Sequence, residues 1–195
     1  MKYIESGKEY QKIKFQSANP HQKSIEECEF ADCIFESCDF SQKSFRNSIF
    51  ENCVFNKTNL ATCKFMDTRM SDCKFSGCKL TGIDWSTLNR AIGLKLDFEI
   101  CDLSYSSFFK MNISGSRFIN CKVYEADFTE CKMKKVVLRG SDLMHTNFNN
   151  TDLQEADFRK AINYFFDPGK NNCKNAKFSY IEALNLLKYF GIIIE

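Results

Sequence analysis

Eleven cysteines are the residues of this 195-residue chain that most directly suggest chemistry. Cys33, Cys53 and Cys73 are spaced by twenty residues, and Cys101 and Cys121 repeat that spacing further along. If this spacing stacks them, a straight column of thiols does not offer the tetrahedral ligand set that zinc requires, and parallel Cβ vectors do not suit disulfides. Buried cysteine otherwise behaves as a small apolar residue. We therefore expect small inward-facing side chains at these positions, with a metal site and structural disulfides as the weaker alternatives.

The other candidates for acid–base or nucleophilic chemistry are few. His21 and His145 are the only histidines, and they lie too far apart to support a Cys/His or Ser/His pair. Several aspartates directly precede an apolar residue, a placement that suits corner hydrogen bonds or a solvated face: Asp39, Asp84, Asp102, Asp127, Asp142, Asp152 and Asp157. Glycine-rich phosphate-binding spacing is missing from the sequence. We therefore expect neither an enzyme nor a metal or cofactor.

Apolar residues recur at every fifth position, first from 25 to 85 and then, after a shift of three residues, from 98 to 158. This period matches neither the 3.6-residue helix nor the two-residue strand. A chain that turns a corner every five residues closes a square in about twenty, and successive coils can pair in parallel at about 4.8 Å. The inward residues should then stack as a core ladder that includes Phe35, Phe55, Phe75, Phe98, Phe118 and Phe158.

Small residues lie two positions before many of these apolar centres, as in CEFADCIFESCDF (28–40) and ADFTE (126–130). This pattern resembles the pentapeptide-repeat family, whose unit reads approximately A(D/N)LXX with Cys, Ser, Thr or Val in place of Ala. The resemblance implies an all-β, right-handed quadrilateral β-helix, a solenoid that we expect to end in a short C-terminal α-helix and tail. The scaffold alone implies no particular activity.

The repeat divides the chain into five expected segments. They are an N-terminal cap that lays an irregular strand over the first coil (1–24), a first repeat segment (25–85), a divider (86–97), a second repeat segment (98–160), and a turn, helix and dimerisation tail (161–195). We interpret the divider as a bend or offset between two stacked subdomains, and within it residues 91–96 resemble the divider of Qnr-type members of the family. A simple insertion at one corner is the alternative.

The C-terminal segment combines a helix signal with an apolar end. Ser179 to Glu182 reads as a capping box, Gly191 as the helix stop, and 192–194 as a short β-branched strand. Residues 178–194 resemble the C-terminal dimerisation helix and tail of Qnr-type and microcin-immunity members. We therefore favour a symmetric homodimer over self-capping, formed through Ala183, Leu184, Leu187, Phe190, Ile192, Ile193 and Ile194.

Those relatives act on DNA gyrase. The resemblance therefore implies a non-enzymatic, rod-shaped dimer that interacts with DNA gyrase or topoisomerase IV and protects it from a quinolone- or microcin-type poison. The net charge of +2 argues against a surface that mimics DNA, and both pentad runs lack the projecting loops of Qnr-type proteins. The microcin-immunity members are therefore the closer functional analogue.

A general protein-interaction scaffold with an unrelated partner is the second hypothesis. Its partner patch would use apolar residues that the repeat points outward, which are Tyr105, Phe109, Ile119 and Tyr124, although scattered surface residues are an equal alternative. The basic residues from 132 to 139 are expected to be solvated, so we expect no direct DNA binding. The polar start of the chain and the lack of a long apolar run predict a cytoplasmic protein without a membrane span.

Overall fold

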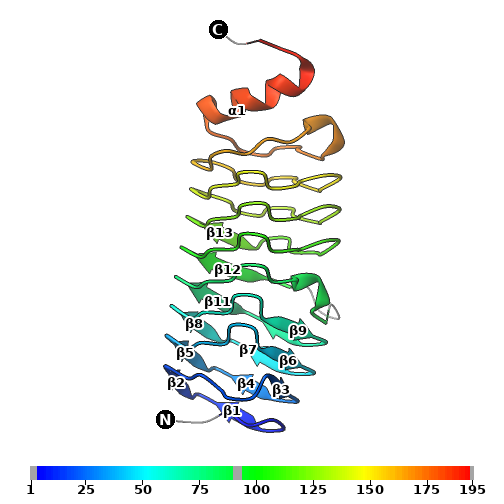
Figure 1. Cartoon of the computed structure of the whole chain (residues 1–195). Helices are drawn as coiled ribbons and strands as arrows, with labels where there is room; N and C mark the ends of the chain where they lie inside the picture. Colours follow the sequence, from blue (N-terminus) through cyan, green and yellow to red (C-terminus); the bar gives the residue numbers. More distant parts are fainter. Residues whose placement is uncertain (1–3, 90–93, 194–195) are drawn as a thin grey trace.

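The computed structural model of the chain describes residues 4–89 and 94–193. The chain winds into a stack of four-sided coils, with the N-terminus at one end of the rod and helix α1 at the other (Figure 1). We number the four sides walls 1 to 4, in the order in which the chain passes through them. Each residue of a wall pairs in parallel with the equivalent residue of the next coil, usually twenty positions further on. The solenoid expected from the pentad pattern is confirmed.

Short strands form three of the walls in the N-terminal half. Wall 1 contains β1 (Glu9–Gln11), β4 (Glu29–Ala31), β7 (Ile49–Glu51) and β10 (Arg69–Ser71). Wall 2 contains β2 (Lys14–Gln16), β5 (Ile34–Glu36), β8 (Val54–Asn56), β11 (Cys73–Ser76), β12 (Leu96–Glu99) and β13 (Arg117–Ile119). Wall 4 contains β3 (Ser24–Glu26), β6 (Ser44–Arg46) and β9 (Lys64–Met66). Wall 3 is made of single-residue bridges that run from Asp39 to Ile162.

The core of the rod is a set of side-chain columns, of which the wall 2 column is rich in phenylalanine. The rings of Phe35 and Phe55 are 4.6 Å apart and 10° from parallel, and those of Phe55 and Phe75 are 4.7 Å apart. Stacked rings at this separation match the spacing of paired coils, about 4.8 Å. The column continues at 5.1 Å to Phe98 and at 5.0 Å from there to Phe118. Further along, Leu138 is buried at the next level and Phe158 stacks on Phe178.

The N-terminal coil is more regular than the sequence pattern suggested. Tyr10 pairs with Phe30 and stacks on its ring at 5.1 Å, and Phe15 pairs with Phe35. These residues fall in phase with the pentads that begin at Ile25, so the expected irregular strand is replaced by a full coil. Ile4 is buried at the end of this coil. The irregular portions of the described N-terminus are therefore the residues before β1 and the third side of this coil (18–23), which has no bridge to the next coil.

The divider leaves three walls continuous. Phe75 pairs directly with Phe98, a step of 23 residues instead of 20, and wall 3 and wall 4 cross with the same step. Trp85, which opens the 3₁₀ turn η1 (Trp85–Thr87), stacks between Phe65 at 5.7 Å and Phe108 at 5.8 Å. The extra residues therefore enter through wall 1, a register that favours a corner insertion over an offset of two subdomains. Residues 90–93, which include Ala91, Ile92 and Gly93 of the expected divider, lie outside the described residues.

The C-terminal end closes the rod with a 3₁₀ turn and a helix. The turn η2 spans Pro168–Lys170, α1 spans Tyr180–Leu187, and η3 (Lys188–Phe190) ends at Gly191 in the left-handed region (φ 70°). Ser179 is the N-cap, but its Oγ accepts a hydrogen bond from the Lys160 N–H at 2.8 Å instead of capping α1. The expected capping box is therefore wrong in its contacts, because the serine joins the helix start to the coil below.

The expected terminal strand is also wrong for the part that can be described. Ile192 and Ile193 have no strand assignment and no ladder partner among residues 4–89 and 94–193, and Ile194 lies outside these ranges. A strand needs a neighbouring strand to satisfy its backbone groups, and the end of a single chain offers none here.

Candidate interaction surfaces

The small inward residues are hydrogen-bond donors as well as spacers. The Sγ of Cys33, Cys53 and Cys73 donates to the backbone carbonyl of the inward residue one coil below, at 3.3, 3.3 and 3.5 Å. Thr58 and Ser141 make the same contact through their hydroxyls, at 3.0 and 2.9 Å. Cysteine, serine and threonine share a donor that alanine lacks, a property that the spacing argument did not use. The position therefore ties successive coils together from inside.

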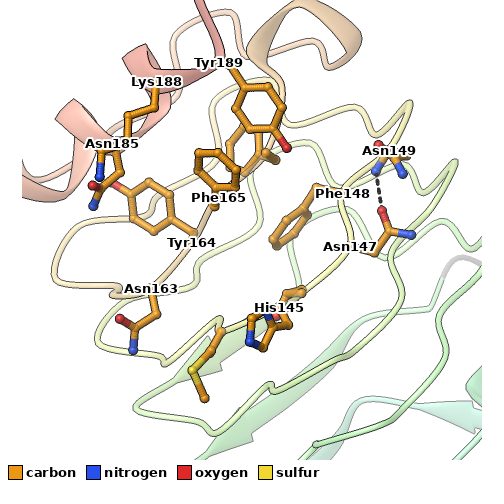
Figure 2. A pocket seen from close by; sticks show the side chains of 13 residues that line it. His145, Asn147, Phe148, Asn149, Asn163, Tyr164, Phe165, Asn185, Lys188 and Tyr189 are labelled. Atoms are coloured by element: carbon orange, nitrogen blue, oxygen red, sulfur yellow. Dashed lines mark hydrogen bonds between the residues drawn. The ribbon is translucent and has the colours of Figure 1, made fainter. Parts of the chain in front are cut away.

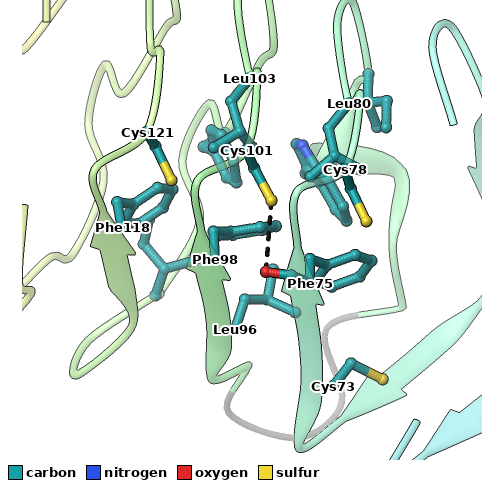
Figure 3. Packing of buried hydrophobic residues seen from close by; sticks show 14 of the residues in the cluster. Cys73, Phe75, Cys78, Leu80, Leu96, Phe98, Cys101, Leu103, Phe118 and Cys121 are labelled. Atoms are coloured by element: carbon teal, nitrogen blue, oxygen red, sulfur yellow. Dashed lines mark hydrogen bonds between the residues drawn. The ribbon is translucent and has the colours of Figure 1, made fainter. Parts of the chain in front are cut away.

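The five predicted cysteines belong to two columns. Cys33, Cys53 and Cys73 follow wall 2, where Cys73 lies opposite Leu96 across the divider. Cys101 and Cys121 follow wall 3 together with Cys78, and the Cys101 Sγ donates to the Phe75 carbonyl at 3.4 Å (Figure 3). Cys121 donates at 3.4 Å to the Ile119 carbonyl of its own coil.

Burial makes the Cys73 thiol a poor nucleophile. Every cysteine is free, and ten of the eleven are buried. Desolvation raises the pKa of the Cys73 thiol to about 12, so the thiolate is scarce at neutral pH. Within the described residues, no group of three or more His, Cys, Asp or Glu side chains has an arrangement that could hold a metal ion.

The C-terminal end, from α1 to Ile193, carries seven of the fifteen exposed large hydrophobic residues of the described chain. We call C-terminal apolar surface the group of exposed residues Tyr180, Ile181, Leu187, Tyr189, Phe190, Ile192 and Ile193. Ile181 is 76% exposed and Ile193 84% exposed. A soluble monomer rarely exposes such a contiguous group, so this end of the rod is the strongest candidate for a protein interface.

The predicted dimerisation residues divide between the two sides of this helix. Leu187, Phe190, Ile192 and Ile193 are exposed and belong to the C-terminal apolar surface. Ala183 and Leu184 are half-buried. Leu186, which the sequence argument passed over, is the buried residue of α1 and packs into the core cluster. The helix therefore covers the last coil with one face and exposes another.

The outward apolar residues of the second half do not form one patch. Ile119 lies beside Ile100 at the corner between walls 2 and 3, because the Ile100 N–H donates to the Ile119 carbonyl at 2.9 Å. Tyr105 and Tyr124 are joined in the same way at 2.8 Å, at the next corner. Phe109 follows at the corner after that, with the Lys110 Nζ 4.8 Å from its ring centre. The four predicted residues are thus spread over three successive corners.

The charges of the second half are largely paired. Lys134 and Lys135 both contact Glu155, at 3.5 and 3.6 Å. Asp157 is 7% exposed and accepts from Arg139 at 2.7 Å and from Arg159 at 2.8 Å. Hydrogen bonds from Arg159 and then from Arg139 hold the pKa of the Asp157 carboxyl well below its usual range. These two carboxylates contact four cationic side chains, so the ion pairs reduce the positive charge of this region without cancelling it.

The geometry defines a class of protein, the four-sided parallel solenoid, here with an exposed apolar end. The family model for the pentapeptide repeat region matches residues 23–108 and 94–161. The chain therefore belongs to the pentapeptide-repeat family. No curated protein matches the sequence significantly.

Solved structures of the same family show the same fold. A trypsin-treated variant of QnrB1, a plasmid-mediated fluoroquinolone resistance protein, matches 96% of this chain and 97% of its own, at 16% identity and a TM-score of 0.56. Full-length QnrB1 matches 95% and 98% of the two chains, at 16% identity and a TM-score of 0.52. HetL, from the cyanobacterium Nostoc sp. strain PCC 7120, matches 90% of this chain and 85% of its own, with 13% identity and a TM-score of 0.39. None of the helices in the described ranges is long and apolar enough to cross a membrane.

Proposed function

We propose that this protein is a non-enzymatic binding protein that forms a homodimer through its C-terminal apolar surface. We further propose that the dimer interacts with DNA gyrase or topoisomerase IV and protects it from a quinolone- or microcin-type poison. The carrying observation is the exposed apolar surface at the C-terminal end of the rod. The similarity in fold to QnrB1 supports the choice of a type II topoisomerase as the partner.

The length of the rod is compatible with such a partner. The wall 2 column passes through nine levels from Phe15 to Phe178. At about 4.8 Å per level, this column is about 38 Å long. Two rods joined at their C-terminal ends would span roughly two turns of B-DNA, at about 34 Å per turn. A topoisomerase that grips such a length of duplex has a surface of matching extent.

Because the surface charge is nearly balanced, we expect the dimer to bind its partner through complementary shape. The net charge is +2, and the second half pairs its lysines and arginines with acidic side chains. Long-range attraction to a basic channel would therefore be weak. We expect binding that depends little on salt concentration.

The oligomeric state tests the first part of the proposal. Size-exclusion chromatography with light scattering should give twice the chain mass of 22.7 kDa for the unmodified protein. Ile193→Asp should give a monomer, because a charge in an apolar interface must be desolvated on assembly. Ile100→Asp is the matched control, since Ile100 is also exposed but lies at a corner of the second half. A monomeric unmodified protein, or a dimeric I193D variant, contradicts the proposed interface.

A gyrase assay tests the second part. DNA supercoiling by purified gyrase is measured with a fluoroquinolone or a gyrase-directed microcin, with and without the protein. Protection by the dimer and its loss in the I193D variant would support the proposal. Absence of both binding and protection would exclude a topoisomerase as the partner and would favour a general protein-interaction scaffold. For such a scaffold, the adjacent residues Tyr105 and Tyr124 are the better candidate contact.

A further inference from the structure

A cavity of about 640 Å³ lies between the last coils and the C-terminal helix. Its lining comes from three segments, which are the corner at 144–149, the loop at 163–166, and residues 185, 188 and 189 of α1 and η3 (Figure 2). Pockets that hold small ligands commonly measure about 300–1,000 Å³ and combine aromatic walls with a few polar groups. Of the residues that line this cavity, only Tyr189 also belongs to the C-terminal apolar surface of the proposed dimer.

Aromatic rings form one side of the cavity. Phe165 and Tyr189 stack on each other at 4.4 Å and are both about half exposed, so they offer ring surface to a ligand. Phe148, which is almost fully buried, also lines the cavity (Figure 2). Flat rings of this kind favour a planar ligand, because stacking is strongest between parallel faces.

Four carboxamides provide the polar contacts. Asn147 accepts from the Asn149 N–H through its Oδ1 at 3.2 Å, which leaves its NH₂ group available as a donor. Asn163 donates through Nδ2 to Asp142 at 2.8 Å, which leaves its Oδ1 available as an acceptor. Asn185 faces the same cavity from α1. A ring that carries both donors and acceptors on its edge, as a nucleobase does, suits this set better than a hydrocarbon ring.

A buried hydroxyl at the cavity has no partner. Tyr164 lines the cavity, is 1% exposed, and lies between Asn163 and Asn185 (Figure 2). Within residues 4–89 and 94–193, its hydroxyl makes no hydrogen bond. An unsatisfied buried hydroxyl is costly, but this one is closed off from solvent and therefore belongs to the wall of the cavity, not to its ligand contacts.

The charge of the lining favours an anion. Lys188 lines the cavity and no aspartate or glutamate belongs to the lining, while Asp142 and Glu182 lie behind it as acceptors from Asn163 and Asn185. A lysine on a flexible stem is a common partner of phosphate. We propose that this cavity binds a nucleoside monophosphate, with its base stacked on the outer face of the Phe165–Tyr189 ring pair, its base edge on the asparagines, and its phosphate on Lys188.

Calorimetric titration of the full-length protein tests this assignment, with AMP, GMP, adenosine and inorganic phosphate as probes. At least one of the two nucleotides should bind, and phosphate alone should bind more weakly than either. Tyr189→Ala should weaken nucleotide binding by about tenfold through lost stacking, and Tyr189→Phe should restore it. Tyr180→Ala is the matched control, because Tyr180 lies on α1 outside the cavity.

A second substitution separates the phosphate contact from the base contact. Lys188→Gln should weaken AMP binding by about tenfold and leave adenosine binding unchanged. Lys174→Gln, at an exposed lysine outside the lining, should change neither. The proposal is overturned if AMP and GMP produce no binding heat at millimolar concentration, or if Y189A and K188Q bind AMP as the controls do. Dimer mass and gyrase protection are measured separately, so either proposal can fail without the other.

Discussion

The two halves of the rod follow the same five-residue rule but form their walls differently. Up to β11, three walls carry strands of three or four residues. Beyond β13, the described walls pair through single residues. There most corners are closed by a hydrogen bond from the third residue after an inward position, as from the Val136 N–H to the Met133 carbonyl at 3.0 Å. The constant element is the inward side chain, so the pentad pattern specifies the core and leaves the wall geometry free.

The cores of the two halves also differ. The first half stacks rings in several columns, as between Phe30 and Phe50 at 4.7 Å. The second half places aliphatic residues at many inward positions, all buried: Leu103, Ile113, Val123, Met133, Leu138, Leu143 and Leu153. Rings contribute stacking in addition to buried area, whereas aliphatic columns rely on packing alone. The first half should therefore lose more stability than the second from a single truncation.

The largest expected effect comes from breaking one column in each half. Phe55→Ala removes a ring that stacks on both neighbours, at 4.6 and 4.7 Å, and should lower the free energy of unfolding by about 4–5 kcal/mol. Leu138→Ala should cost about 3 kcal/mol. Urea unfolding monitored by circular dichroism measures both. Equal costs for the two variants would contradict the distinction between the cores.

An intermediate effect is expected for buried carboxylates. Asp157→Asn removes the charge that pairs with Arg139 and Arg159. It should lower the free energy of unfolding by about 1–2 kcal/mol at pH 7, less than a fully buried hydrogen bond to a charged group contributes, because both arginines are half exposed. Asp39→Asn, the first-half comparison, should cost less, since Asp39 accepts only from Ser41. Unfolding curves of the two variants at pH 7 give this difference. A larger loss of unfolding free energy in D39N than in D157N would contradict this prediction.

The stabilisation by Asp157 and Asp39 should also depend on pH. Hydrogen bonds from Arg159 and Arg139 depress the pKa of Asp157, and those from Ser41 depress the pKa of Asp39. A depressed carboxyl pKa stabilises the fold above the unfolded-state pKa, about 3.9, and this contribution is lost as the pH falls through the lower folded-state value. The difference in stability between the unmodified protein and D157N should therefore shrink below about pH 4. A difference that stays constant from pH 7 to pH 2 would exclude the charge as its cause.

The smallest effect should be equal in the two halves. Thr58→Val and Ser141→Ala each remove a buried hydroxyl that donates to the coil below, at 3.0 and 2.9 Å. Each should cost about 1 kcal/mol, because the carbonyl left behind is buried. Thermal unfolding of both variants tests whether this inner contact is the feature that the halves share. A loss of stability in only one of the two variants would contradict the idea that both halves rely on this contact.

The fold could be predicted because five-residue periodicity has few structural solutions. The stacking of Phe35, Phe55 and Phe75 follows from their twenty-residue spacing alone. The first coil escaped prediction because Tyr10 and Phe15 occupy inward positions beside polar neighbours, and that short run gives a weak signal. A search for pentads upstream of Ile25 could have found them.

The candidate surfaces were harder to predict, since they depend on corners. Spacing indicates that Tyr105, Phe109 and Ile119 point outward, but only the coil geometry places them at separate corners. The cavity near Tyr164 arises where 163–166 departs from the pentad rule, and a periodic pattern carries no information about such a loop. The buried position of Leu186 depends likewise on how α1 docks on the last coil.

The 23-residue step across the divider has a consequence for folding fidelity. In a uniform stack, a chain displaced by one whole coil would keep every inward side chain inside, so the displaced and correct arrangements would be close in energy. With Phe75 held to Phe98, such a slip across the divider shifts one half by three positions against the other. Polar residues would then enter the shaft. The three-residue insertion therefore fixes the register of one half against the other, so that each coil begins at one defined residue.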